Sequence, residues 1–199
     1  MPFLFFRTAN IRIIIILAID IYEDMPLIKE IKKHNCTIGI WEMNESLTQL
    51  LKLSKTTDLP DFKNKKKKHE FLSSRLLLSK LLPNASITYN KYNAPEIEGS
   101  AFISISHSTK LAAIIISNTK AGLDIEQISK KPLKLASKFI SKDHHNPLSE
   151  EKATLIWSCK EAIFKWHQKG NVNFIIDIEI APFLIKNQGT ITAKFKAEV

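Results

Sequence analysis

The sequence predicts an α+β fold made of two similar halves that meet near residue 115. Strand and helix patterns follow one another as strand, helix and strands, and then again as helix and strands. The length of 199 residues allows one substantial domain, or two small halves that share a core. The hydrophobic fraction of 44% and the charged fraction of 25% are typical of a globular protein.

In the first half, residues 25–41 are expected to form strands around a turn. Leucines at helical spacing predict a helix over 45–53. A polar stretch with a run of lysines then precedes a second predicted helix over 69–82. The strict alternation of 101–108 predicts a strand that runs into a turn.

In the second half, 110–117 and 121–128 are expected to be strands joined as a hairpin through 118–120. A short helix is predicted over 131–140, followed by a polar loop and a long helix that ends near Gly170. The remaining residues are predicted to form a strand, a turn and a strand.

The first 24 residues differ in character from the rest of the chain. Their apolar run, 13–19, is too short to span a membrane. No small-residue cleavage site follows the run, although the length of the segment does not exclude a signal peptide. An extra strand, a frayed tail and a translation start at Met25 are the other interpretations.

The net charge of +9 indicates an acidic partner, which leaves nucleic acid, anionic membrane, phosphate-rich ligands and acidic proteins open. The lysines at 63 and 65–68 form the densest basic run, but few aromatic residues lie among them. A solvated charge run is therefore the first interpretation, followed by a docking surface for an acidic partner.

The two cysteines, Cys36 and Cys159, show no metal-ligand or CxxC spacing. This favours a reducing compartment and predicts Cys159 as a small core residue.

The segment GLDIE places Asp124 and Glu126 on one face of a strand. Two neighbouring carboxylates repel each other unless a cation lies between them, and oxygen ligands of this kind suit Mg²⁺. A half-exposed strand with polar residues directed outward is the simpler alternative for this pattern alone.

The helix WSCKEAIFKWHQKG has two apolar faces rather than one. A narrow polar strip between them carries Glu161, Lys165 and Ser158. This strip is expected to lie in or beside a crevice, although an ordinary i,i+4 ion pair between Glu161 and Lys165 remains the alternative. Lys160 lies on a different strip and is a weaker candidate.

The segment SISHS places His107 at the end of a strand between two serines. Histidine and hydroxyl groups at such a turn can bind phosphate oxygens. A structural histidine with satisfied hydrogen bonds is the alternative.

Taken in order, SISHS (104–108), GLDIE (122–126) and WSCKEAIFK (157–165) resemble the 4′-phosphopantetheinyl transferases of the longer, surfactin-synthetase-activating type. The resemblance covers about residues 25–199. It implies two half-domains related by pseudo-two-fold symmetry, 25–115 and 116–199, with the metal-binding and catalytic motifs in the second. Residues 1–24 are then an extension outside the family pattern.

The resemblance implies Mg²⁺-dependent transfer of the phosphopantetheine arm of coenzyme A to a serine of an acyl or peptidyl carrier protein, with release of adenosine 3′,5′-bisphosphate. Asp124, Glu126 and Glu161 are expected around Mg²⁺, with Glu161 also the candidate general base. The remaining residues expected to bind coenzyme A or its pyrophosphate are Arg75, Ser106, His107 and Lys165.

The family often has Gly-Lys-Pro before the SISHS segment, whereas this chain has Asn93-Ala94-Pro95. Either the affinity for the 3′-phosphate of coenzyme A is lower, or Lys91 or the 63–68 run substitutes. A weakened module that only binds coenzyme A or a carrier is the alternative function. A nucleic-acid-binding protein is a third hypothesis, resting on the basic charge. We expect a cytoplasmic monomer that acts on an acidic carrier and binds neither nucleic acid nor membrane, with fatty acid, polyketide and peptide synthesis as its possible settings.

Overall fold

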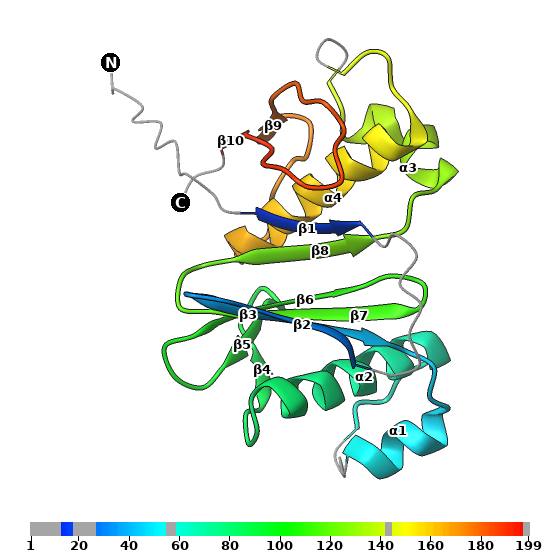
Figure 1. Ribbon diagram of the computed structural model, residues 1–199, viewed down its shortest axis with the longest axis vertical. Coiled ribbons are helices and arrows are strands. Elements are labelled where there is room, and N and C mark those ends of the chain that lie inside the picture. Colours follow the sequence, from blue (N-terminus) through cyan, green and yellow to red (C-terminus); the bar gives the residue numbers. More distant parts are fainter. Residues whose placement is uncertain (1–12, 18–26, 55–58, 142–144, 197–199) are drawn as a thin grey trace.

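The computed structural model describes residues 13–17, 27–54, 59–141 and 145–196. Its centre is a four-stranded antiparallel sheet in the order β2-β3-β7-β6 (Figure 1). Nearly continuous buried runs in the central strands β3 and β7 place buried side chains on both faces of the sheet. The strands are β2 (Leu27–Lys33), β3 (Cys36–Glu42), β6 (Phe102–His107) and β7 (Leu111–Ser117).

One face of this sheet is covered by the helices α1 (Leu47–Ser54) and α2 (Lys65–Leu81). Trp41 of β3, Leu72 of α2 and Ile114 of β7 belong to the same buried cluster. The short hairpin of β4 (Ile87–Tyr89) and β5 (Pro95–Ile97) follows α2 and leads back to β6.

The other face of the sheet is covered by β8 (Gly122–Glu126), the strand that contains GLDIE. Leu123 and Ile125 are fully buried against Ile38 and Ile115 of the central sheet. On its own edge β8 pairs in parallel with β1 (Ile13–Leu17), so the two form a small separate sheet (Figure 1).

The long helix α4 (Glu150–His167) packs on β8. The Ser149 hydroxyl caps its N-terminus by accepting from the backbone N–H of Lys152. At the other end the C-cap residue Gln168 is left-handed with φ of 63°, so the helix ends at His167, three residues before Gly170. The remaining elements are the helix α3 (Lys130–Lys134), the 3₁₀ turn η1 (Ala136–Lys138), β9 (Ile178–Ile180) and β10 (Ala193–Phe195).

The structure is of the mixed α/β kind that the sequence predicts. The hairpin prediction for 110–117 and 121–128 is wrong, because β7 pairs with β3 and β6 while β8 pairs with β1. The second helix also begins earlier than predicted, since the Asn64 side chain caps it and lysines 65–68 form its first turn.

Within the predicted N-terminal extension, 13–17 form a strand, as one of the interpretations proposed. The proposed start at Met25 lies outside the described residues. None of the helices in the described part of the chain combines the length and apolar content that a membrane crossing requires.

Candidate active site

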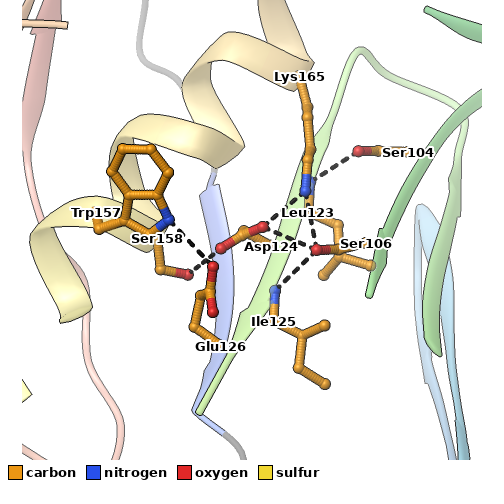
Figure 2. Close-up of polar contacts among 9 residues, drawn as sticks. All are labelled: Ser104, Ser106, Leu123, Asp124, Ile125, Glu126, Trp157, Ser158 and Lys165. Atoms are coloured by element: carbon orange, nitrogen blue, oxygen red, sulfur yellow. Dashed lines mark hydrogen bonds and ion pairs between the residues drawn. The ribbon is translucent and has the colours of Figure 1, made fainter. Parts of the chain in front are cut away.

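Asp124 lies at the centre of a set of polar contacts between β8, β6 and α4 (Figure 2). The residue is 3% exposed. Its Oδ1 accepts from the Ser106 hydroxyl at 2.8 Å and from Lys165 Nζ at 2.6 Å. Its Oδ2 accepts from the Ser158 hydroxyl at 2.8 Å. Three donors from two other elements therefore compensate for the burial of this carboxylate.

Lys165 reaches Asp124 from the last turn of α4, one turn beyond Glu161. Its ammonium also donates to the Ser106 hydroxyl at 2.9 Å. The ion pair that Lys165 forms is thus between two segments, rather than along one exposed helix face. The polar strip predicted between the two apolar faces of α4 accounts for this position.

Glu126 and Glu161 are the other two carboxylates of the site. Glu126 Oε1 accepts from the indole N–H of Trp157 at 3.1 Å. Burial, followed by the charge of Asp124, raises the pKa of Glu126. Burial raises the pKa of Glu161, the Lys165 charge opposes this shift, and Asp124 and Glu126 add to it. The three carboxylates therefore act on one another electrostatically.

His107 is held at the end of β6 by the helix α2. Its Nε2 lies 2.7 Å from the Ser74 hydroxyl and 3.1 Å from the Glu70 carbonyl oxygen, and the Ser74 hydroxyl donates to the same carbonyl at 2.6 Å. A carbonyl oxygen only accepts, so this arrangement favours the tautomer with hydrogen on Nε2. Burial, followed by the Lys165 charge, lowers the pKa of His107 to about 4.

A cavity of about 400 Å³ lies between α2, the β4–β5 hairpin, β6 and the end of α4. The cations that line it are Lys67, Arg75 and Lys165. Arg75 stacks on Phe71, with its guanidinium carbon 3.3 Å from the ring centroid, and donates to the Tyr89 hydroxyl. The other lining residues include Phe62, Ser74, Tyr92, Ala94, Ser104, His107 and Phe164.

Lys165 connects this cavity to the carboxylates, because it lines the cavity and binds Asp124. The site thus combines a cationic, aromatic cavity with a group of acidic side chains. Anionic ligands with a flat ring system suit such a cavity.

Comparison with known proteins matches residues 120–199 to the family model of the 4′-phosphopantetheinyl transferase superfamily. Residues 120–199 belong to this superfamily. The matched segment contains β8 and α4, and with them Asp124, Glu126, Glu161 and Lys165. The resemblance that the three motifs predict is thereby confirmed.

The chain is also 29% identical over 148 residues to the 4′-phosphopantetheinyl transferase gsp of Aneurinibacillus migulanus. The aligned region covers 67% of this chain and 60% of that transferase. The chain therefore spans less than two thirds of the length of the phosphopantetheinyl transferase that it matches.

Asp124, Glu126 and Glu161 fit a divalent cation in charge and donor type. Three carboxylates and the Lys165 ammonium leave a formal excess of negative charge, and hard oxygen donors are those that Mg²⁺ prefers. Asp124 Oδ2 accepts a hydrogen bond from Ser158, and a carboxylate oxygen has two lone pairs. Within the described residues, no three His, Cys, Asp or Glu side chains are already gathered closely enough to hold a metal ion.

The remaining predicted site residues fall into two groups. Arg75 and His107 line the cavity. Ser106 instead lies between Lys165 and Asp124, and it is Ser104 that lines the cavity. Lys160 is buried and donates to the Phe174 and Ile178 carbonyls, so it ties the loop after α4 to the helix.

The basic run contributes one residue to the cavity, Lys67, and Ala94 lines the same cavity. Lys91 lies instead with its ammonium 5.0 Å from the centre of the Tyr92 ring. Cys159 is 1% exposed and burial raises its pKa to about 12, which confirms it as a core residue.

Three contact residues were not predicted to be site residues: Ser74, Trp157 and Ser158. Ser158 shares the polar strip of α4 with Lys165, so its position on the helix could have predicted that it belongs to the site. Trp157 belongs to the motif, but the sequence predicts it as an apolar packing residue. Its role in the site became visible only in the structure, where its indole N–H donates to Glu126. Ser74 carried no signal, because its contact with His107 joins two segments that are distant in the chain.

Proposed function

We propose that this protein transfers 4′-phosphopantetheine from coenzyme A to a serine of an acyl or peptidyl carrier protein. The observation that carries the proposal is Lys165, which joins a cationic, aromatic cavity to a group of three carboxylates. The proposal includes Mg²⁺ as cofactor, an acidic carrier as partner, a cytoplasmic monomer, and two half-domains with pseudo-two-fold symmetry.

The cavity supports a nucleotide with several phosphate groups as the ligand. Lys67 and Arg75 of α2 and Lys165 of α4 supply positive charge, and Phe71 and Tyr92 supply ring surfaces. Arg75 is already ordered by its stacking on Phe71, so little freedom is lost when its guanidinium binds a phosphate. His107 would face such a ligand with Nδ1, because Nε2 is occupied by Ser74 and Glu70. In this tautomer Nδ1 accepts hydrogen bonds, so it suits a hydroxyl or amino group of the nucleotide rather than an ionised phosphate oxygen.

The reaction is a displacement at phosphorus. The carrier serine Oγ forms a bond to the phosphorus that carries pantetheine, and the bond from that phosphorus to the bridging pyrophosphate oxygen breaks. The electron pair remains on that oxygen, which leaves as part of adenosine 3′,5′-bisphosphate. Glu161 is the candidate to receive the serine proton, directly or through a water molecule.

Positioning and neutralisation of charge are the main requirements of such a transfer. Asp124, Glu126 and Glu161 would hold Mg²⁺, which when bound would offset the charge on the leaving group. Lys165, held by Asp124 and Ser106, would place its ammonium beside a pyrophosphate oxygen.

Two isosteric substitutions test the carboxylates. Asp124→Asn and Glu161→Gln are each expected to lower the transfer rate by about 100-fold or more, because each removes a charge that the reaction requires. The assay follows the gain of one phosphopantetheine mass by an apo carrier protein with coenzyme A and Mg²⁺. Retained activity in either folded variant would contradict the assigned roles.

The same assay separates transfer from binding alone. A chain that only binds coenzyme A would give a calorimetric binding signal but no mass change in any of several carrier proteins. That result would exclude the transferase and leave the weakened binding module.

A second test concerns the cation that replaces the missing lysine at position 94. Lys67→Met is expected to weaken coenzyme A binding about tenfold, because Lys67 lines the cavity. Lys91→Met is the matched control and is expected to leave the affinity within a factor of about two, since Lys91 lies against Tyr92. Calorimetric titration measures both, and equal losses in the two variants would reject this assignment.

A further inference from the structure

Strand β8 carries two of the three carboxylates, so whatever holds β8 also holds the site. Its residues from Gly122 to Ile125 are all buried. A buried strand requires partners for its backbone N–H and C=O groups along both edges. The partners on its two edges are of different kinds.

On the edge that faces β6, side chains take the place of a backbone ladder. The N–H of Leu123 donates to the Ser104 hydroxyl at 3.0 Å, and the N–H of Ile125 donates to the Ser106 hydroxyl at 3.2 Å. Successive backbone groups of a strand point to opposite edges. The N–H groups of Asp124 and Glu126 therefore point away from β6.

The strand on that second edge is β1, which pairs with β8 in parallel from Ile13 opposite Gly122 to Leu17 opposite Glu126. In a parallel ladder, one residue bonds to the two residues on either side of its partner. The backbones of Ile14 and Ile16 are thus directed at β8, whereas those of Ile13, Ile15 and Leu17 are directed away. β1 also lies close to α4, the other element that contributes to the site (Figure 1).

We propose that β1 is a positioning segment of the site: its backbone fixes β8 from the edge opposite to Ser104 and Ser106, and thereby fixes Asp124 and Glu126. The expected effect on the transfer rate rests on the proposed function. The expected effect on the position of β8 does not. It assigns a role to part of the N-terminal extension, which lies outside the segment that matches the family model.

The register provides a matched set of variants in the full-length chain. Ile14→Pro combined with Ile16→Pro removes the two N–H groups that face β8 and puts proline rings in their place. Ile15→Pro is the control, because its N–H faces away from β8 and proline is tolerated on the outer side of an edge strand. The single variant Ile16→Pro serves as a milder form of the first.

Two measurements are made on each variant. Hydrogen exchange of the backbone amides is expected to show that Asp124 and Glu126 lose protection in Ile14→Pro/Ile16→Pro, while Leu123, Ile125 and the amides of β3 and β7 keep theirs. The transfer rate with an apo carrier is expected to fall about 100-fold in this variant, because small displacements of positioning groups are costly. Ile15→Pro is expected to match the unmodified chain in both measurements.

Unchanged protection of Asp124 and Glu126 in the double and single variants would overturn the inference, whatever the transfer rates. The inference would also be overturned if Ile15→Pro lost as much protection at Asp124 and Glu126 as the double variant. If no form of the chain, including the unmodified one, transfers phosphopantetheine, the proposed function fails, while selective loss of protection at Asp124 and Glu126 still supports the positioning of β8 by β1.

Discussion

At the scale of single residues, the site depends on how Asp124 is held. Burying a carboxylate without partners costs several kcal/mol, but Ser106, Ser158 and Lys165 all donate to it. The same contacts fix the direction of its side chain and place the Lys165 ammonium beside the cavity. A single buried charge thus orders groups from β6 and α4 as well as β8.

His107 is the residue through which we expect the stability of the folded chain to depend on pH. Its pKa is lowered from 6.5 to about 4, chiefly by burial and then by Lys165. In the folded chain the ring therefore stays neutral over a range in which the unfolded chain takes up a proton. Stability is expected to fall as pH drops from 6.5 toward 4, and His107 has little effect on stability above that range.

The prediction is tested with His107→Gln, whose amide can still donate toward Glu70. Between pH 7 and pH 4, the unmodified chain is expected to lose about 2 kcal/mol more unfolding free energy than the variant. Urea denaturation at a series of pH values measures this difference. If the difference in unfolding free energy between the two proteins did not change with pH, His107 would have the same pKa in the folded and the unfolded chain. The pKa of His167 is also lowered by burial, but His167 is present in both proteins. Its contribution to the pH dependence of the unfolding free energy is therefore the same in both.

At the scale of elements, the close contact of β8 with α4 determines the geometry of the site. A Cβ atom at Gly122 would lie 1.9 Å from the Ala162 carbonyl oxygen and 2.8 Å from the Trp166 nitrogen. Only glycine permits this approach, which brings Ser158 and Lys165 of α4 within hydrogen-bond distance of Asp124.

Gly122→Ala is therefore expected to destabilise the chain by about 3 kcal/mol or more, because helix backbone cannot yield as a side chain can. Gly189→Ala is the control, since a Cβ there meets nothing within 4 Å. It is expected to change the unfolding free energy by less than about 0.5 kcal/mol. Urea denaturation compares the two, and equal effects would show that α4 adjusts to the added methyl group.

At the scale of the whole molecule, the net charge of +9 favours encounter with an acidic partner. The cavity cations account for only part of this charge, and lysines such as Lys130, Lys131 and Lys134 lie on α3 after β8. Long-range attraction of this kind raises association rates and is screened by salt.

Raising the ionic strength from about 0.05 to about 0.5 M is expected to lower kcat/KM for an acidic carrier several-fold, mainly through KM. A carrier variant with its acidic side chains neutralised is the control and is expected to lose most of this salt dependence. Steady-state transfer kinetics measure both. Equal salt dependence for the two carriers would place the effect in coenzyme A binding instead.

The mixed α/β fold and most elements could be predicted from the sequence, because they depend on local periodicity and caps. The polar strip of α4 and the two carboxylates of GLDIE are properties of this kind. The partner of β8 could not be predicted, because pairing between distant segments depends on which edges remain free and which groups become buried. Adjacent strands in the sequence suggested a hairpin, whereas β8 pairs with β1 and is bound to β6 through serine hydroxyls.

The residues of GLDIE and WSCKEAIFK by themselves determined which side chains are available for chemistry and on which face of a strand or helix they lie. Only the tertiary structure decided that Lys165 pairs with Asp124, that Ser74 and Glu70 hold His107, and that Lys67 lines the cavity. The physical reason is that each of these contacts joins segments far apart in the chain. Their geometry depends on the packing of α2, β8 and α4 around the sheet, which no local pattern encodes.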